Sequence, residues 1–312
     1  MTERSSPPGP SERAVIAFVT NLLALQPTRI ARAYAFGTNA VYEVDAGGQR
    51  LILKASMNRD ALRAEAWACA RSVEAGFPAP EILAGVDGIG DEGMSAFVMR
   101  RVSGESITPG HVAFGDLGAT LRRLHEVDLP GFGPLAEVAW KQHDEFTLPH
   151  GSWLGFLRSI SSDTRRLADL CALAMPVAEA VEASLETHAE ALSAVTGSLC
   201  HGDLKANHIF VDGDRLVGVI DWGDAVVGDP FWELARYAHR GDAPSLSLLM
   251  RGYDPEGSMA DDVGWRIPLY SVMWMMVDAI VDHRLGSSVD GLLEAAMRDI
   301  ARATTSATDP NV

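Results

Sequence analysis

The stretch from residue 200 to residue 222, CHGDLKANHIFVDGDRLVGVIDW, decides the fold. Two apolar runs, 209–211 and 216–220, flank an Asp-Gly pair, a pattern typical of a β-hairpin with a tight turn. Asp203 and His208 would then lie on the loop that enters the first strand, and Asp221 would lie just beyond the second. The pattern predicts two carboxylates and one imidazole at the same end of a short ribbon.

This cluster has the residue types that phosphoryl transfer requires. The reaction needs an acceptor hydroxyl aligned with a γ-phosphate, and a divalent metal that neutralises charge between the phosphates. We therefore expect Asp203 to accept the hydroxyl proton as the catalytic base, and Asp221 to hold magnesium.

The His-Gly-Asp-Leu motif, the strand pair and the following Ile-Asp-Trp resemble the aminoglycoside phosphotransferase family. The resemblance implies an α+β, protein-kinase-like fold with two lobes. The small lobe would contain a five-stranded antiparallel sheet, and the large lobe would be mostly helical. We expect a nucleotide-binding lobe at 1–102 and a catalytic and acceptor-binding lobe at 103–312. The implied cofactors are ATP, or GTP, and Mg²⁺.

The second metal ligand departs from the pattern shared with protein kinases. The position five residues after the catalytic Asp is usually Asn; here it is His208, and Asn207 lies one place earlier. Some branches of the family, including macrolide kinases, carry His at this position, and by that resemblance His208 is the second ligand. Because magnesium prefers oxygen donors, a nitrogen ligand is less expected. Asn207 therefore stays open as the alternative.

A loop near the N-terminus is expected to cover the phosphates. The runs 29–36 and 40–44 are predicted strands, joined through a Gly-Thr-Asn turn. The resemblance places the phosphate-covering loop at this turn, with Thr38 and Asn39 beside the nucleotide. A single Gly in a turn is ordinary by itself, so this assignment depends on the downstream motif.

Lys54 ends the apolar strand 51–54. An unpaired buried ammonium is costly, so we expect it to meet phosphate and a carboxylate. The helix predicted over 60–75 carries Glu65, and the resemblance implies that Glu65 orients Lys54 toward the α- and β-phosphates. The alternative is an edge-strand lysine that extends to water beside an exposed helical glutamate.

The nucleotide base is expected at the junction of the two lobes. Runs 82–86 and 96–100 complete the five strands of the small lobe. The resemblance places the hinge immediately after them. By that resemblance Arg100 and Val102 offer main-chain groups to the adenine edge, while Met99 packs behind the base.

Two regions are candidates for acceptor recognition. The irregular segment 130–150 is long for a loop inside a compact domain, which suggests a function. In the family the comparable region shapes the acceptor pocket, so Asp144 and Glu145 could bind ammonium groups. The alternative is that both are solvated loop acids.

A buried helix over 264–285 is the other region. It has Tyr270, Trp274, Asp278 and Asp282 at four-residue spacing, which places them on one face. Two acids and two aromatic rings on one stripe could bind an aminated sugar. A core helix with a polar edge would show the same pattern. Further helices are predicted over 116–127, 153–159, 163–174 and 177–194, the last two separated by Pro176.

The charge balance restricts the partners. The 312 residues include 26 Lys plus Arg against 42 Asp plus Glu, a formal charge of −16, which argues against a broad nucleic-acid footprint. The acidity suits a cationic acceptor, although ordinary solubility would explain it too. The three cysteines have no metal or redox spacing. No stretch has eighteen uninterrupted apolar residues and the first ten residues lack a signal-peptide core, so we expect a cytoplasmic protein without membrane contact.

The sequence as a whole predicts a small-molecule kinase. It would transfer the γ-phosphate of ATP or GTP to a hydroxyl of an aminoglycoside-type antibiotic, as a monomer or weak dimer, and confer resistance. One alternative keeps the chemistry and changes the acceptor to a macrolide, a cationic peptide antibiotic, or a metabolite of the choline or homoserine type. Another is a pseudokinase that binds nucleotide without transferring phosphate, with His208 as the sign of lost activity.

Overall fold

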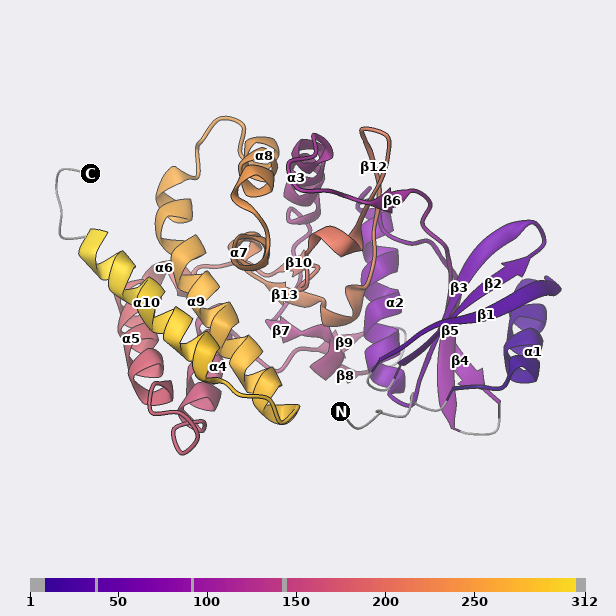
Figure 1. Ribbon diagram of the computed structural model, residues 1–312, viewed down its shortest axis with the longest axis horizontal. Helices are drawn as coiled ribbons and strands as arrows, with labels where there is room; N and C mark the ends of the chain where they lie inside the picture. The colour runs from indigo at the N-terminus through magenta and orange to yellow at the C-terminus, as the bar shows by residue number, and fades with distance from the viewer. Residues whose placement is uncertain (1–8, 37–38, 91–92, 142–144, 307–312) are drawn as a thin grey trace.

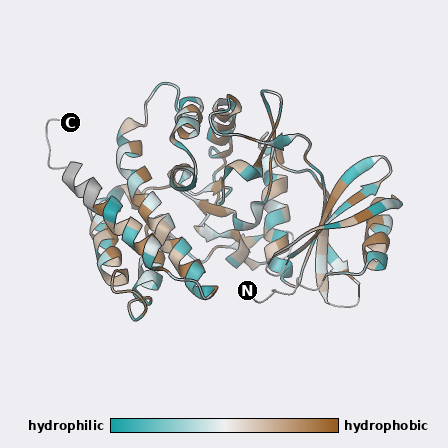
Figure 2. Ribbon diagram, in the orientation of Figure 1, coloured by the Kyte–Doolittle hydropathy of each residue, from teal (hydrophilic) through white to brown (hydrophobic). Residues whose placement is uncertain are grey.

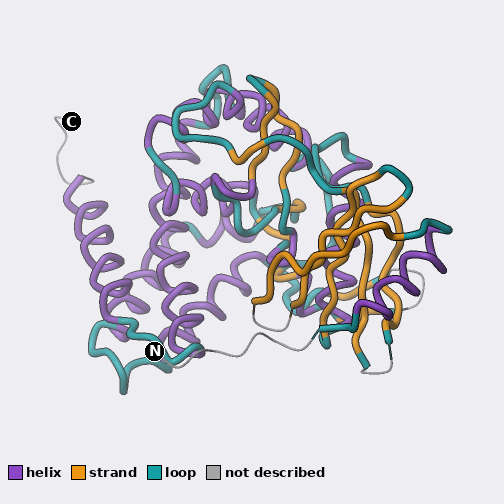
Figure 3. The backbone as a smooth tube through the Cα atoms, turned by 45° about the vertical axis from the view of Figure 1, so that its right-hand side comes forward, coloured by secondary structure: helices purple, strands orange, loops and turns teal. Residues whose placement is uncertain are grey.

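The small lobe is built on one antiparallel sheet with the strand order β1-β2-β3-β5-β4. The computed structural model describes residues 9–36, 39–90, 93–141 and 145–306. Figure 1 shows this sheet at one end of the molecule and the helix-rich lobe at the other, and Figure 3 shows the same segregation of strands and helices. The strands are β1 (Pro27–Phe36), β2 (Asn39–Ala46), β3 (Gln49–Ser56), β4 (Ile82–Ile89) and β5 (Met94–Arg100).

Two helices cover opposite faces of this sheet, α1 (Glu12–Leu23) and α2 (Arg59–Glu74) (Figure 1). Since successive strand residues point to opposite faces, Val98 packs with the α1 cluster while Phe97 packs with the α2 cluster. Asn58 starts α2, because its side chain accepts a hydrogen bond from the Ala61 N–H at 3.1 Å. The predicted small-lobe strands and the helix predicted over 60–75 are therefore confirmed, with bounds that differ by a few residues.

The large lobe is mostly helical, and its helices alternate hydrophobic and hydrophilic residues along their length (Figure 2). Trp153 is fully buried and donates a hydrogen bond from Nε1 to the Tyr270 hydroxyl at 2.8 Å. No helix in the described residues combines the length and the apolar character needed to cross a membrane. The helices are α3 (Ala113–Leu124), α4 (Trp153–Arg165), α5 (Ala174–Thr187), α6 (Ala189–Ser193), α7 (Pro230–Arg240), α8 (Ala243–Tyr253), α9 (Ala260–Arg284) and α10 (Asp290–Ser306).

Short strands carry the motif that decides the fold. The predicted hairpin is present as β11 (Ile209–Asp212) and β12 (Arg215–Val219). Strand β6 (Glu105–Ser106), which follows the junction between the lobes, pairs with β11. The remaining short elements are β7 (Gly133–Pro134), η1 (Leu135–Glu137), β8 (Ala139–Trp140), β9 (Phe146–Thr147), β10 (Ser198–Cys200), η3 (Ala206–His208), η4 (Trp222–Asp224) and β13 (Val226–Gly228).

The helices predicted over 163–174 and 177–194 are wrong in their bounds. Helix α4 continues past 159 to Arg165, turns follow it, and α5 begins at Ala174. Pro176 lies in the first turn of α5, where backbone N–H groups have no acceptor within the helix. The proline therefore starts this helix rather than separating two.

Helices α3 and α8 approach each other through glycines. A Cβ atom added at Gly252 would lie 1.9 Å from the Gly115 carbonyl oxygen, and one added at Gly118 would lie 2.0 Å from the Leu249 carbonyl oxygen. Both contacts are with backbone, which cannot turn aside as a side chain can. The distance between the two helices thus depends on these two positions.

Gly252→Ala is expected to destabilise the protein by about 1–3 kcal/mol, the usual scale of an overpacked contact. Gly264→Ala is the matched control, because Gly264 lies in α9 with nothing within 4 Å of an added Cβ. The control should be as stable as the wild type or up to about 1 kcal/mol more stable, since alanine is the better helix former. Urea denaturation measures both, and equal stability of Gly252→Ala and wild type would contradict the close contact.

Candidate active site

A cavity of about 480 Å³ lies between the sheet of the small lobe and the hairpin β11–β12. Its walls come from both lobes, so residues that are far apart in the sequence face the same space. Among the residues singled out from the sequence, the lining contains Asn39, Lys54, Glu65, Met99, Arg100, Val102, Asn207, His208 and Asp221.

Lys54 joins the two lobes through an ion pair on each side. Strand alternation turns its neighbours Leu53 and Ala55 into the α1 cluster, so Lys54 points to the other face, toward the cavity. Its Nζ lies 2.7 Å from Glu65 Oε2 and 3.2 Å from Asp221 Oδ1. Burial alone would lower the pKa of Lys54, but the two carboxylates outweigh it and the pKa lies above its ordinary value. Lys54 therefore carries a positive charge at neutral pH.

Asp221 has an unusual backbone conformation at the end of β12. Its φ is 68° and its ψ 66°, in the left-handed region that residues other than glycine rarely adopt. Its side chain is 50% exposed and faces the cavity. Burial raises its pKa, but Lys54, by its charge and its hydrogen bond, together with the neighbouring His208 and His201 outweighs burial and holds the pKa of Asp221 below its ordinary value. An ionised, accessible carboxylate held in a strained turn suits a metal ligand.

The hydrogen bonds of His208 fix its tautomer. Its Nδ1 lies 3.0 Å from the Asp203 carbonyl oxygen and must donate to it, so Nε2 carries the lone pair. Nε2 lies 3.5 Å from Asp221 Oδ2. Burial, followed by the neighbouring His201 and Lys205, lowers the pKa of His208 to about 4. The ring is therefore neutral and directs an unprotonated nitrogen toward Asp221.

The Asp221 carboxylate, together with nucleotide phosphates and water, would give magnesium the oxygen ligands that it prefers, and His208 would add the one nitrogen. Asn207, the alternative ligand, is exposed and lines the cavity. The tautomer and the short separation from Asp221 support His208, and its role as a ligand stays a prediction.

Asp203, the candidate base, is held by two cations that the sequence interpretation missed. Lys205 Nζ lies 2.5 Å from Asp203 Oδ2, and Arg236 Nη2 lies 3.2 Å from Asp203 Oδ1. Lys205 is only two residues away along the motif, so its proximity could have been inferred. Arg236 comes from α7, and nothing in the local pattern indicates it.

The loop that carries Asp203 is braced by its own motif. The His201 ring accepts a hydrogen bond at Nδ1 from the Asp203 N–H at 3.2 Å, and donates one from Nε2 to the Ile220 carbonyl at 2.9 Å. Gly202 has a φ of 81°, and a Cβ there would lie 1.9 Å from the Asp224 carbonyl oxygen. Only glycine allows the loop to pack this closely against η4.

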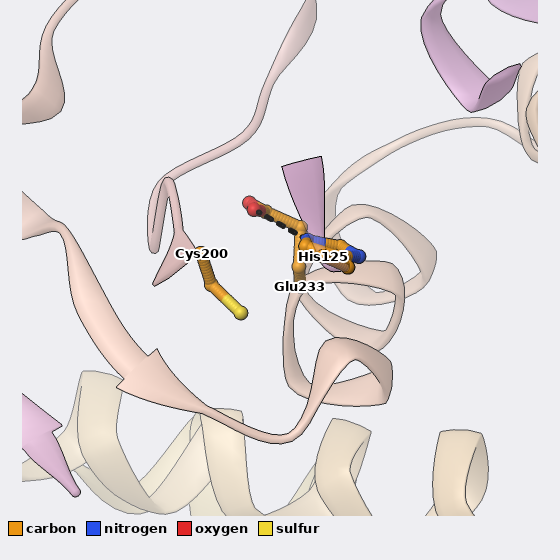
Figure 4. A group of neighbouring side chains, drawn as sticks. All are labelled: His125, Cys200 and Glu233. Atoms are coloured by element: carbon orange, nitrogen blue, oxygen red, sulfur yellow. Dashed lines mark ion pairs between the residues drawn. The ribbon is translucent and has the colours of Figure 1, made fainter. Parts of the chain in front are cut away.

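A buried group behind the loop, His125, Cys200 and Glu233, completes the brace (Figure 4). Glu233 accepts hydrogen bonds from the backbone N–H groups of His201 at 2.6 Å and Gly202 at 3.3 Å. His125 Nε2 lies 3.6 Å from Glu233 Oε2. Burial raises the pKa of the Cys200 thiol well above its ordinary value, and both carboxylate oxygens of Glu233 already accept hydrogen bonds from the loop. In this arrangement Glu233 supports the loop from behind.

The part of the cavity next to Met99 and Val102, where the sequence predicts the nucleotide base, is apolar. Met99 and Val102 line it as expected, but the Arg100 N–H donates to the Glu81 carbonyl at 2.8 Å, so that donor is not available to a base. Arg100 could therefore offer a base only its carbonyl, and its role stays a prediction. The sequence interpretation also missed the apolar walls, which are Val41, Ile52, Phe210 and Ile220.

The candidates for acceptor recognition are placed less favourably. Thr38 and Asp144 lie outside the described residues. Glu145 is exposed on the hairpin β8–β9, which packs against α2 through the Phe146 and Trp67 rings.

The stripe on α9 differs from expectation. Trp274 and Asp278 are buried, and Asp278 forms ion pairs with Arg236 and Arg240 and a hydrogen bond with His239. Because the two arginines already neutralise it, Asp278 offers no free carboxylate to an ammonium group. Asp282 is half-buried near the end of the helix.

His208→Asn is expected to make the free energy of unfolding less dependent on pH in the acid range. As the pH falls from about 6.5 to about 4, this histidine gains a proton in the unfolded state, whereas in the folded state the buried ring stays neutral. The free energy of unfolding of the wild type therefore decreases in this window. The variant should lose less, as measured by urea denaturation at a series of pH values. The exposed His283→Asn is the control and should follow the wild type. Identical profiles for His208→Asn and wild type would contradict a buried neutral ring.

Comparison with known proteins assigns the family. The model of the phosphotransferase enzyme family matches residues 32–260, well over half of the chain. Hygromycin-B 4-O-kinase of Escherichia coli is 26% identical over 233 residues, which span 70% of this chain and 61% of that protein. This chain therefore covers less than two thirds of that kinase.

Solved structures share the fold. The aminoglycoside phosphotransferase APH(4)-Ia superposes with a TM-score of 0.70 at 17% identity, over 93% of this chain and 99% of that chain. A Thermobifida fusca protein described as a fructosamine-3-kinase gives a TM-score of 0.71 at 25% identity, over 94% and 100%. These matches confirm the kinase-like α+β fold. The chain belongs to the phosphotransferase enzyme family, the family of the aminoglycoside phosphotransferases that its central motif resembles.

Proposed function

We propose that this protein is a kinase that transfers the γ-phosphate of ATP to a hydroxyl of an amine-bearing sugar of the aminoglycoside type. The observation that carries the proposal is the convergence of Lys54, Asp221 and His208 on one cavity, with Asp203 hydrogen-bonded to His208 through its backbone. Residues 1–102 would form the nucleotide-binding lobe, and 103–312 the catalytic and acceptor-binding lobe.

Each residue has a defined part in this chemistry. Lys54, fixed by Glu65, would bind the α- and β-phosphates, and the apolar walls would enclose the base. His208 and Asp221 would hold magnesium, which when bound supplies positive charge between the phosphates. Asp203 would orient the acceptor hydroxyl and take its proton as the oxygen bonds to the γ-phosphorus and ADP leaves. The joint presence of Lys54, Asp203 and Asp221 argues against a pseudokinase.

The choice of nucleotide and acceptor draws on charge and on the relatives. APH(4)-Ia variants have been solved as ternary complexes with hygromycin B and ADP or AMP-PNP, which supports ATP over GTP here. The formal charge of −16 favours a cationic acceptor. The match to the described fructosamine-3-kinase favours a second candidate, a sugar amine of the fructosamine type. Both acceptors combine hydroxyl groups with an amine.

Asp203→Asn is expected to lower kcat by about a hundredfold or more, the usual scale for the loss of general-base catalysis. Binding of Mg–ATP, measured by calorimetry, should be retained because Asp203 is not expected to contact the nucleotide base. Asp214→Asn is the control, since Asp214 is exposed at the hairpin turn and should leave kcat unchanged. Unchanged turnover of Asp203→Asn would overturn the assignment of the base.

ADP release measured with a panel of acceptors should identify the substrate class. We expect release with hygromycin B or another aminoglycoside, and no release with a macrolide, choline or homoserine. Release with fructosamine alone would establish the second candidate. Mg–ATP binding without release on any acceptor would favour the pseudokinase and count against the proposal.

A further inference from the structure

Arg236 lies at the centre of a buried ion cluster beside the candidate base. Its Nη2 donates a hydrogen bond to Asp203 Oδ1 at 3.2 Å. Its Nη1 donates to both carboxylate oxygens of Asp278, at 3.0 and 3.1 Å. Arg236 belongs to α7 and Asp278 to α9, so one guanidinium connects the catalytic loop to two packed helices.

The surroundings fix the guanidinium in this orientation. Its Cζ lies 4.1 Å from the centre of the Trp274 ring, a favourable cation–π distance. Within the described part of the chain, buried Arg236 Nε has no hydrogen-bond partner, so the two carboxylates and the ring determine how the group lies. His239 Nε2 at 3.2 Å and Arg240 Nη2 at 2.8 Å hold the other side of Asp278.

Asp278 remains a charged anchor. Burial raises its pKa, but the hydrogen bond from His239 and the charge of Arg236 outweigh burial, and the pKa of Asp278 lies below its ordinary value. The guanidinium of arginine does not lose its proton in proteins. The Arg236–Asp278 pair is therefore ionised throughout the pH range of enzyme assays.

The two cations on Asp203 differ in mobility. The Lys205 side chain is 31% exposed and holds Oδ2, whereas Arg236 is 8% exposed and holds Oδ1. A lysine on a flexible four-carbon stem can release its partner more readily than a buried fork held by a second carboxylate. Oδ1 of Asp203 is thus held in place by Arg236, whereas Oδ2 can be released by Lys205 and become available to another partner.

We propose that Arg236 is a positioning residue that clamps Asp203 Oδ1 and so presents Oδ2 to the acceptor hydroxyl. This inference rests on the proposed function and adds a residue to it. In the transfer, Oδ2 takes the hydroxyl proton while the hydroxyl oxygen bonds to the γ-phosphorus and the bond to the leaving nucleoside diphosphate breaks. A carboxylate free to rotate would lose this alignment, and a misplacement of 1 Å can cost about a hundredfold in rate.

The test compares Arg236→Ala with Arg240→Ala. Both variants remove an ion pair to Asp278, but only Arg236 touches Asp203. We expect Arg236→Ala to lower kcat by about 30- to 100-fold with the KM for ATP unchanged, and Arg240→Ala to stay within about twofold of wild type. Added guanidinium chloride at millimolar concentration should restore part of the activity of Arg236→Ala and none in Arg240→Ala.

Arg236→Lys keeps the charge if the alanine variant fails to fold. A lysine cannot bind both carboxylates as a fork, so a normal melting temperature with reduced kcat supports the clamp. Equal rates for the Arg236 and Arg240 variants, or a loss confined to the KM for ATP, would overturn it.

Crystal structures supply a readout that needs no acceptor. A turned Asp203 carboxylate in Arg236→Lys, with an unmoved one in Arg240→Ala, supports the clamp even if no acceptor is found. An unmoved Asp203 in both variants refutes it. Failure of the proposed function would instead appear in the wild type, as Mg–ATP binding without transfer to any acceptor.

Discussion

The ion triad of Lys54, Glu65 and Asp221 is the constraint on which the site depends. A buried ammonium is stable only beside compensating charge, and removing one partner of a buried pair costs about 3–5 kcal/mol. Glu65 supplies compensation from the small lobe and Asp221 from the large lobe. The triad thus favours the arrangement in which the two lobes face each other across the cavity. Its exposed member is Asp221, which lines the cavity.

Next to the triad, the backbone polar groups of the catalytic loop form hydrogen bonds with buried side chains. His208 uses one ring nitrogen to hold the loop and leaves the other for Asp221. The His201 ring links the Asp203 amide to the carbonyl of Ile220, next to Asp221, and Glu233 accepts hydrogen bonds from the two preceding backbone amides, those of His201 and Gly202. Since a buried unpaired amide costs about 1–3 kcal/mol, these contacts hold the loop in one conformation. Asp203 and His208, which this loop carries, are therefore held in fixed positions.

The sequence predicted those features of the site that depend on residues close together in the chain or on a known motif. The hairpin, the cluster of Asp203, His208 and Asp221, and the pairing of Lys54 with Glu65 all follow from residues near each other in sequence or from a motif that fixes their order. Arg236 and Glu233 were missed because they act from α7, whose position relative to the loop is set by packing. Ordinary residue types on an amphipathic helix give no local signal of such contacts.

The residues Tyr270, Trp274, Asp278 and Asp282 on α9 show the same limit of prediction from sequence. Four-residue spacing correctly indicated a shared face, but the spacing does not say what that face meets. It meets α7, whose Arg236 and Arg240 neutralise Asp278. Pro176 illustrates a related ambiguity, because a proline at a helix start and one between helices look alike in sequence.

Strand β6 ties the connection between the lobes to the catalytic hairpin, with Ser106 opposite Phe210 and Glu105 opposite Val211. Gly104, just before it, sits so close to the Val211 carbonyl that no side chain fits. The connector is therefore part of a hydrogen-bonded ladder and not a free tether. One residue inserted there would bring another side chain to the position of Gly104, against the Val211 carbonyl. Evolution can therefore lengthen the surface loops of this enzyme far more freely than this connector.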